Sequence, residues 1–258
     1  MLFPAELQTS EPKIPWRSLP VFLNLGNLRV FPEDPALPRI SPMQPTLSET
    51  QCRLLRMIFE RGSESASNAL SKWLGREVRL MISEVEQVEL EDATALLGPP
   101  EALVAACSME LSGPLSGHML LVFTDRAGLA LVDVLLGQPS GTSKAWGELE
   151  QSAAKETTNI VGCAYLNALL THLPGAMLRE GVGEELVPTS PVFHREFAGA
   201  LLEFALLEQA LDLDKVLLVQ TAFAAAHQET QLNWTLLFVP DRESLRAMAA
   251  ALAQLETR

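Results

Sequence analysis

The sequence LLVFTDR, residues 120–126, returns as LLFVPDR at residues 236–242. Each copy is an apolar run typical of a buried strand, followed by an Asp that suits the N-cap of a helix. A repeated tripeptide precedes each copy: Asn-Ala-Leu occurs at residues 68–70 and again at residues 167–169. Two matches in the same order predict an internal duplication of the chain.

The two predicted halves, residues 46–137 and 147–256, share one order of elements. Hydrophobic periodicity in the first half predicts a long helix, three strands and a shorter helix, at residues 47–74, 78–82, 102–111, 117–124 and 126–136. Thr46 or Ser48 is the N-cap candidate of the long helix, and Gly75 is its predicted stop. One half alone would leave a sheet face in water. We therefore predict an α+β fold in which two helix/three-strand/helix units, related by a pseudo-two-fold axis, share an antiparallel sheet covered by long helices.

The prolines are distributed unevenly along the chain. Nine of the 17 prolines fall within residues 1–45. Proline prevents long helices, so we predict a largely extended, non-catalytic arm over residues 1–45. The duplicated domain then occupies residues 46–258.

Composition excludes several classes of function. The formal net charge is −13, and such a surface repels a nucleic-acid backbone. Apolar runs are far shorter than the roughly 18 residues that a membrane-spanning helix needs. The three cysteines lie far apart and the four histidines have no metal-ligand spacing, so we expect no metal site in this chain and reduced thiols in the cytoplasm.

The second long helix, residues 148–173, carries the candidate chemistry. At 100° per residue, Ser152, Glu156 and Asn159 lie within about 60° of one another. The opposite side of this helix is apolar and consists of Ala154, Val161, Tyr165 and Ala168. We predict that the polar trio faces outward and forms a functional site. The alternative interpretation is that these residues form an ordinary solvated helix face.

The pattern Asp or Ser, three residues, Glu, two residues, Asn on a long surface helix resembles the signature of the CheC, CheX and FliY phosphatases of the chemotaxis response regulator CheY. The stretch ETTNIVGCAYLNAL, residues 156–169, is similar to the CheC helix, and the internal duplication is similar to that family's architecture. The resemblance covers about residues 47–256.

The resemblance implies a cytoplasmic enzyme that removes the phosphoryl group from an aspartate of a CheY-like receiver domain. It implies that Asn159 orients the attacking water, that Glu156 pairs with the receiver's lysine, and that Ser152 supports docking. It also implies no cofactor of the chain's own, a Mg²⁺ ion on the phosphorylated receiver, and a CheD-like adaptor as a second candidate partner.

Two features depart from the family pattern. The first half places Arg53, Met57 and Glu60 opposite the trio, so only the second half carries the motif. The family pattern also has a proline after the helix, for which Pro188 and Pro191 are candidates. The missing first site keeps open a second interpretation, a docking module that binds a receiver or adaptor without turnover.

Overall fold

The computed structural model describes residues 46–173, 185–201, 215–225 and 232–257. Its helices are α1 (Glu49–Leu74), α2 (Leu90–Leu96), α3 (Asp125–Leu135), α4 (Glu148–His172) and α6 (Arg242–Glu256). Its strands are β1 (Val78–Glu89), β2 (Leu103–Ser112), β3 (Gly117–Thr124), β4 (Val187–Pro188), β5 (Val192–Phe197), β6 (Lys215–Ala225) and β7 (Leu232–Pro240). The predicted arm, residues 1–45, lies outside the described residues, and its boundary stays a prediction.

One antiparallel sheet joins the two halves, as the duplication predicts. The strand order is β1-β6-β7-β3-β2, and both β4 and β5 pair with the remaining edge of β2. The first-half strands β1, β2 and β3 correspond to the second-half strands β5, β6 and β7. Exchanging each strand with its counterpart gives the same strand order, read from the opposite edge of the sheet. At the centre, Leu120 pairs with Leu237 and Leu121 pairs with Leu236, and because Leu120 is equivalent to Leu236 and Leu121 to Leu237, the two-fold operation exchanges these two pairs. The pseudo-two-fold axis therefore passes between β3 and β7.

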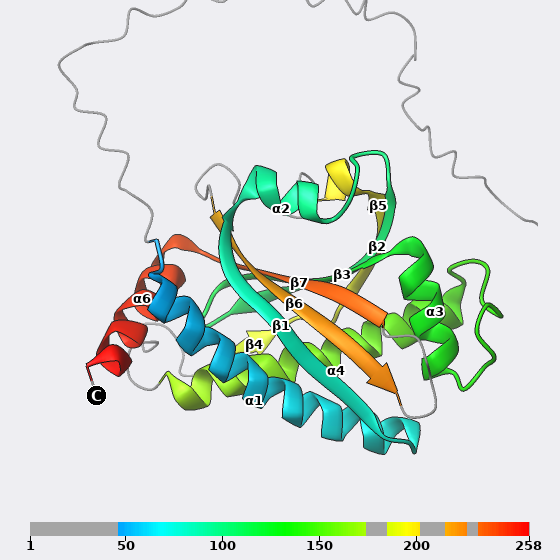
Figure 1. The fold of residues 1–258 in the computed structure, drawn as a ribbon, viewed down its shortest axis with the longest axis horizontal. Coiled ribbons are helices and arrows are strands. Elements are labelled where there is room, and N and C mark those ends of the chain that lie inside the picture. Colours follow the sequence, from blue (N-terminus) through cyan, green and yellow to red (C-terminus); the bar gives the residue numbers. More distant parts are fainter. Residues whose placement is uncertain (1–45, 174–184, 202–214, 226–231, 258) are drawn as a thin grey trace, which may run out of the picture. The chain divides into compact units, whose positions relative to one another are not determined.

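Helices cover both faces of the sheet (Figure 1). The larger core lies between the sheet and α1, α3, α4 and α6, and it includes Phe59, Tyr165 and Phe238. A smaller core lies on the other face, where α2 and a helical turn at residues 198–201 cover Leu120 and Leu218. Figure 1 shows α1 and α4 side by side beneath the sheet, with α2 on the opposite side.

The helix caps predicted from the sequence are observed at α1 and α6 but not at α3. Ser48 caps α1 with a reciprocal capping box, Gly75 ends it at φ 64°, and Asp241 caps α6. The prediction that Asp125 caps α3 is wrong, because the hydroxyl of Thr124 accepts the Ala127 N–H instead. The Asp125 carboxylate accepts hydrogen bonds from Arg195 and from the Trp146 indole.

A buried carboxylate shapes the connection from α3 to α4. Asp133, which is 1% exposed, accepts backbone N–H bonds from Gly141, Thr142 and Ser143 at 2.6, 3.0 and 2.8 Å. Burial favours a higher pKa for Asp133, but the hydrogen bonds from this loop outweigh it and lower the pKa on balance. The loop leads directly into α4, so Asp133 helps to place the helix that carries the trio.

None of the helices that the structure describes is both long enough and apolar enough to cross a bilayer.

Candidate functional site

Helix α4 has one buried and one exposed side, as its pattern predicts. Val161 and Tyr165 are fully buried, and the Tyr165 ring packs edge-on against Phe59 of α1 with ring centroids 5.3 Å apart. Ser152 and Glu156 are exposed on the other side, and Asn159 is half-buried. Packing of the apolar side against α1 and the sheet thus fixes the direction in which the trio points.

The three predicted site residues lie together around one surface hollow. Its volume is 330 Å³, and its lining consists of Ser152, Lys155, Glu156, Asn159, Ser190 and Pro191. The structure therefore brings together all three side chains that the sequence singles out. Their catalytic and docking roles remain predictions.

The second wall of this hollow comes from the segment between β4 and β5. Both strands pair with β2, and the Thr189 N–H donates to the Glu110 carbonyl at 2.9 Å while the Glu110 N–H donates to the Thr189 hydroxyl at 3.0 Å. These hydrogen bonds hold the segment beside α4, so that Ser190 and Pro191 line the hollow. Of the two proline candidates, Pro191 lines the hollow, whereas Pro188 belongs to β4.

Asn159 is held by a neighbour on its own helix. Cys163 Sγ lies 3.6 Å from Asn159 Oδ1 and donates to it. Burial first, and the nearby Glu156 carboxylate second, raise the pKa of Cys163, so this thiol keeps its proton at neutral pH. The carboxamide nitrogen of Asn159 has no bond to any described residue and can serve an incoming group.

The corresponding face of α1 has different chemistry. Met57, at the position equivalent to Glu156, is 55% exposed. Glu60, at the position equivalent to Asn159, forms an ion pair with Arg56 at 3.1 Å. The first half therefore presents an exposed thioether and a paired carboxylate where the second half presents a carboxylate and a carboxamide.

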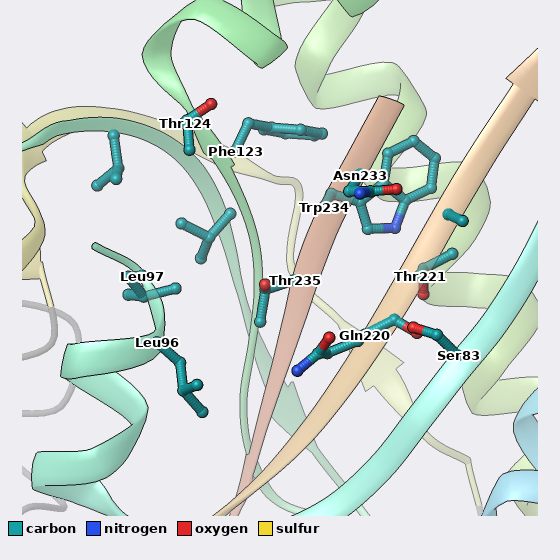
Figure 2. A pocket seen from close by; sticks show the side chains of 13 residues that line it. Ser83, Leu96, Leu97, Phe123, Thr124, Gln220, Thr221, Asn233, Trp234 and Thr235 are labelled. Carbon is teal, nitrogen blue, oxygen red and sulfur yellow. The ribbon is translucent and has the colours of Figure 1, made fainter. Parts of the chain in front are cut away.

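A different hollow lies on the other face of the sheet, beside the end of α2 (Figure 2). Its volume is 290 Å³, and Gln220, Asn233 and Thr235 supply polar groups opposite Leu96 and Leu97. Its lining contains no ionisable side chain and none of the trio. Within the described part of the chain, no three His, Cys, Asp or Glu residues gather in a way that could hold a metal ion.

Sequence reasoning missed two residues of the trio's hollow, Lys155 and Ser190. Lys155 stands inside the motif stretch, so its position on the helix could have indicated it. Ser190 could not be placed without the pairing of β4 and β5 with β2, because it is far from α4 along the chain.

Comparison with known proteins agrees with the fold. No protein-family model matches the chain. A curated relative from Bacillus subtilis (strain 168), named CheY-P phosphatase CheC, is 24% identical over 211 residues, which are 80% of this chain and 95% of the relative. Over most of its length the chain is similar to proteins of the CheC/CheX/FliY type. A second relative, named putative CheY-P phosphatase CheC1, from Halobacterium salinarum, is 25% identical over 122 residues, 45% of this chain and 60% of that protein.

Solved structures show the same fold in the CheC/CheX/FliY-type family and its neighbours. Thermotoga maritima FliY superposes with a TM-score of 0.62 at 14% identity, over 81% of this chain and 99% of that one. The FliM middle domain of H. pylori gives a TM-score of 0.55 at 13% identity, over 80% of this chain and 99% of that one. These similarities concern the fold, and they extend across both halves of the duplication.

Proposed function

We propose that the chain hydrolyses the aspartyl phosphate of a CheY-like response regulator, with Asn159 and Glu156 as catalytic residues and Ser152 as a docking residue. One observation carries the proposal: these three side chains line a single hollow on the exposed side of α4. The name of the B. subtilis relative, CheY-P phosphatase CheC, supports this substrate class.

The reaction needs a positioned water more than it needs a protein nucleophile. Water attacks phosphorus in line with the aspartyl oxygen, the P–O bond to the aspartate breaks, and the receiver regains its carboxylate as inorganic phosphate leaves. Most of the catalysis in phosphoryl transfer comes from positioning and charge balance. We assign the Mg²⁺ ion that balances this charge to the acidic pocket of the receiver.

Asn159 suits the positioning task. A carboxamide both donates and accepts hydrogen bonds, so it can orient a water molecule without removing its proton. Its Oδ1 is already directed by Cys163, and the half-buried position of Asn159 limits the number of rotamers it can adopt.

Glu156 suits the task of holding the receiver in register. It is exposed, one turn before Asn159 on the same side of α4, so its carboxylate can reach a lysine of the partner. A charge-assisted hydrogen bond to that lysine would set the depth at which Asn159 enters the phosphoryl pocket. Ser152, a further turn away at the rim of the hollow, would contact the receiver surface.

The test is the release of inorganic phosphate from a receiver phosphorylated with acetyl phosphate in Mg²⁺. We expect Asn159→Ala to lower kcat by about 100-fold, the usual cost of removing one group that stabilises a transition state. Glu156→Ala should lower kcat/KM strongly, and Ser152→Ala should mainly raise KM. Asn68→Ala and Glu148→Ala remove the same two residue types from exposed helix positions outside the hollow and should change nothing. Wild-type rates in both Asn159→Ala and Glu156→Ala would contradict the proposal.

One observation favours a second function. The first half carries Arg53, Met57 and Glu60 in place of a motif, so half of the duplication is without the catalytic groups. In this alternative, the chain docks on a receiver or a CheD-like adaptor in the cytoplasm without turnover. Receiver binding that leaves the lifetime of the phosphoryl group unchanged would favour docking over catalysis.

A further inference from the structure

A second, larger hollow adjoins the trio and runs between α1 and α4. Its volume is 590 Å³. Arg61, Ser65 and Ala69 of α1 form one wall, and a face of α4 from Asn159 to His172 forms the other. We call this hollow the α1/α4 groove.

The groove is built from equivalent faces of the two repeated helices. By the match of residues 68–70 with 167–169, Arg61 corresponds to Ile160, and Ala69 corresponds to Ala168. Helices α1 and α4 are in close contact at Gly62, where an added Cβ would stand 2.7 Å from the Tyr165 ring. The groove therefore extends across the pseudo-two-fold axis, and only its α4 side carries the trio.

Asn159 connects the groove to the trio's hollow, because it lines both. A domain that brings a phosphoryl group to Asn159 is far wider than this side chain. Such a domain must also lie over the neighbouring end of the groove, so the two hollows are parts of one surface for a single partner.

The charge of this surface differs from that of the chain. The whole chain carries a formal charge of −13, yet Glu156 is the one carboxylate that lines the two hollows. Lys155, Arg61 and His172 line them as well. Arg61 is exposed and forms no ion pair with any residue that the structure describes. An acidic partner surface is complementary to this region.

We propose that the receiver domain covers the α1/α4 groove while its aspartyl phosphate is at Asn159, and that Arg61 pairs with a carboxylate beside the receiver's phosphoryl pocket. This inference rests on the proposed function and adds a role for the first half. Helix α1, which lacks the trio, supplies part of the partner surface for the site on α4.

The experiment compares steady-state kinetics of matched variants on a receiver phosphorylated with acetyl phosphate. Arg61→Glu should raise KM about five- to tenfold with kcat unchanged, and the difference should shrink in 0.5 M salt. Arg53→Glu makes the same change at an exposed position of α1 outside both hollows and should keep the wild-type KM. Ala69→Trp should fill the groove and raise KM about tenfold, whereas Asn68→Trp, next to it but outside the groove, should not.

Three outcomes would overturn the inference. The first is an active wild type whose KM is the same in Arg61→Glu and Ala69→Trp as in their controls. The second is a dimer by light scattering that Arg61→Glu converts to a monomer, because a second copy of the chain would then occupy the groove. The third is a wild type that neither binds nor dephosphorylates receivers, in which case the proposed function fails and the inference fails with it.

Discussion

Cys163 Sγ donates to Asn159 Oδ1 over 3.6 Å, one turn further along α4. The thiol lines the α1/α4 groove, so a group attached to its sulfur would lie against the side chain proposed to hold the attacking water. This relationship gives a chemical probe of the site.

Alkylation of Cys163 with N-ethylmaleimide should abolish receiver dephosphorylation. Cys163→Ala should keep activity within a few-fold of the wild type and resist the reagent, whereas Cys52→Ala should remain sensitive. Because the pKa of Cys163 is raised, inactivation should be slow at pH 7 and accelerate up to and beyond pH 8.5, the ordinary pKa of a thiol.

Glu156→Gln should speed labelling of Cys163 at pH 7, since it removes a negative charge that disfavours the thiolate. Equal labelling rates in Glu156→Gln and the wild type would contradict the account of this pKa.

Tyr165 should report directly on the buried core at high pH. It is the only tyrosine in the chain, and burial raises its pKa to about 12. In the unfolded chain the pKa is about 10. Because the folded pKa is the higher one, the stability from keeping the phenol protonated is complete below about pH 10 and is lost as pH rises toward 12. Tyrosinate absorbance at 295 nm should stay low at pH 10.5 in the folded protein and appear on adding urea. A folded-state titration centred near pH 10 would show that the ring is not buried.

Gly62→Ala should destabilise the protein by about 1 to 3 kcal/mol. The added Cβ would stand 2.7 Å from the Tyr165 ring and 3.1 Å from the Tyr165 Cα, so α1 and α4 must separate. Gly162→Ala is the matched control, because its added Cβ meets only the flexible side-chain ends of Met109 and Met119 and no backbone atom. Urea unfolding should therefore give a larger loss for Gly62→Ala. The reverse order would mean that the helix contact is looser than described.

Asp133→Asn should lower stability by about 1 to 3 kcal/mol at pH 7, because the backbone donors of residues 141–143 lose a charged acceptor. The folded pKa of Asp133 is lowered, so its contribution is present above the unfolded pKa of about 3.9 and is lost as pH falls through the folded pKa. The difference in unfolding free energy between wild type and variant should shrink below pH 4. A difference that stays constant from pH 7 to pH 3 would contradict this account.

The duplication made much of the fold predictable. The repeated sequence stretches place α1 and α4 in equivalent positions of the two halves. The bounds of both helices, predicted from periodicity and stop residues, lie within two residues of those observed. The α3 cap was mispredicted because Asp125 makes a longer-range bond to Arg195 on β5, which local sequence does not contain. Helix α2 was missed for a related reason: it is a short helix that follows β1 directly, without a separating turn signal.

The candidate site was predictable only in part. Helical spacing is enough to place Ser152, Glu156 and Asn159 on one side of α4, because these residues belong to one rigid element. Ser190 and the α1 wall of the groove depend on strand pairing and on helix packing between the halves, which a local pattern does not encode.

The lifetime of the phosphoryl-aspartate itself decides whether Asn159 is a catalytic residue. A receiver labelled with radioactive phosphate is mixed with excess wild-type protein, with Asn159→Ala or with buffer, and the label remaining on the receiver is followed over time. We expect rapid loss of label with the wild type and a lifetime close to that in buffer with Asn159→Ala, while both proteins still bind the receiver. Equal, fast loss with wild type and Asn159→Ala would contradict this expectation.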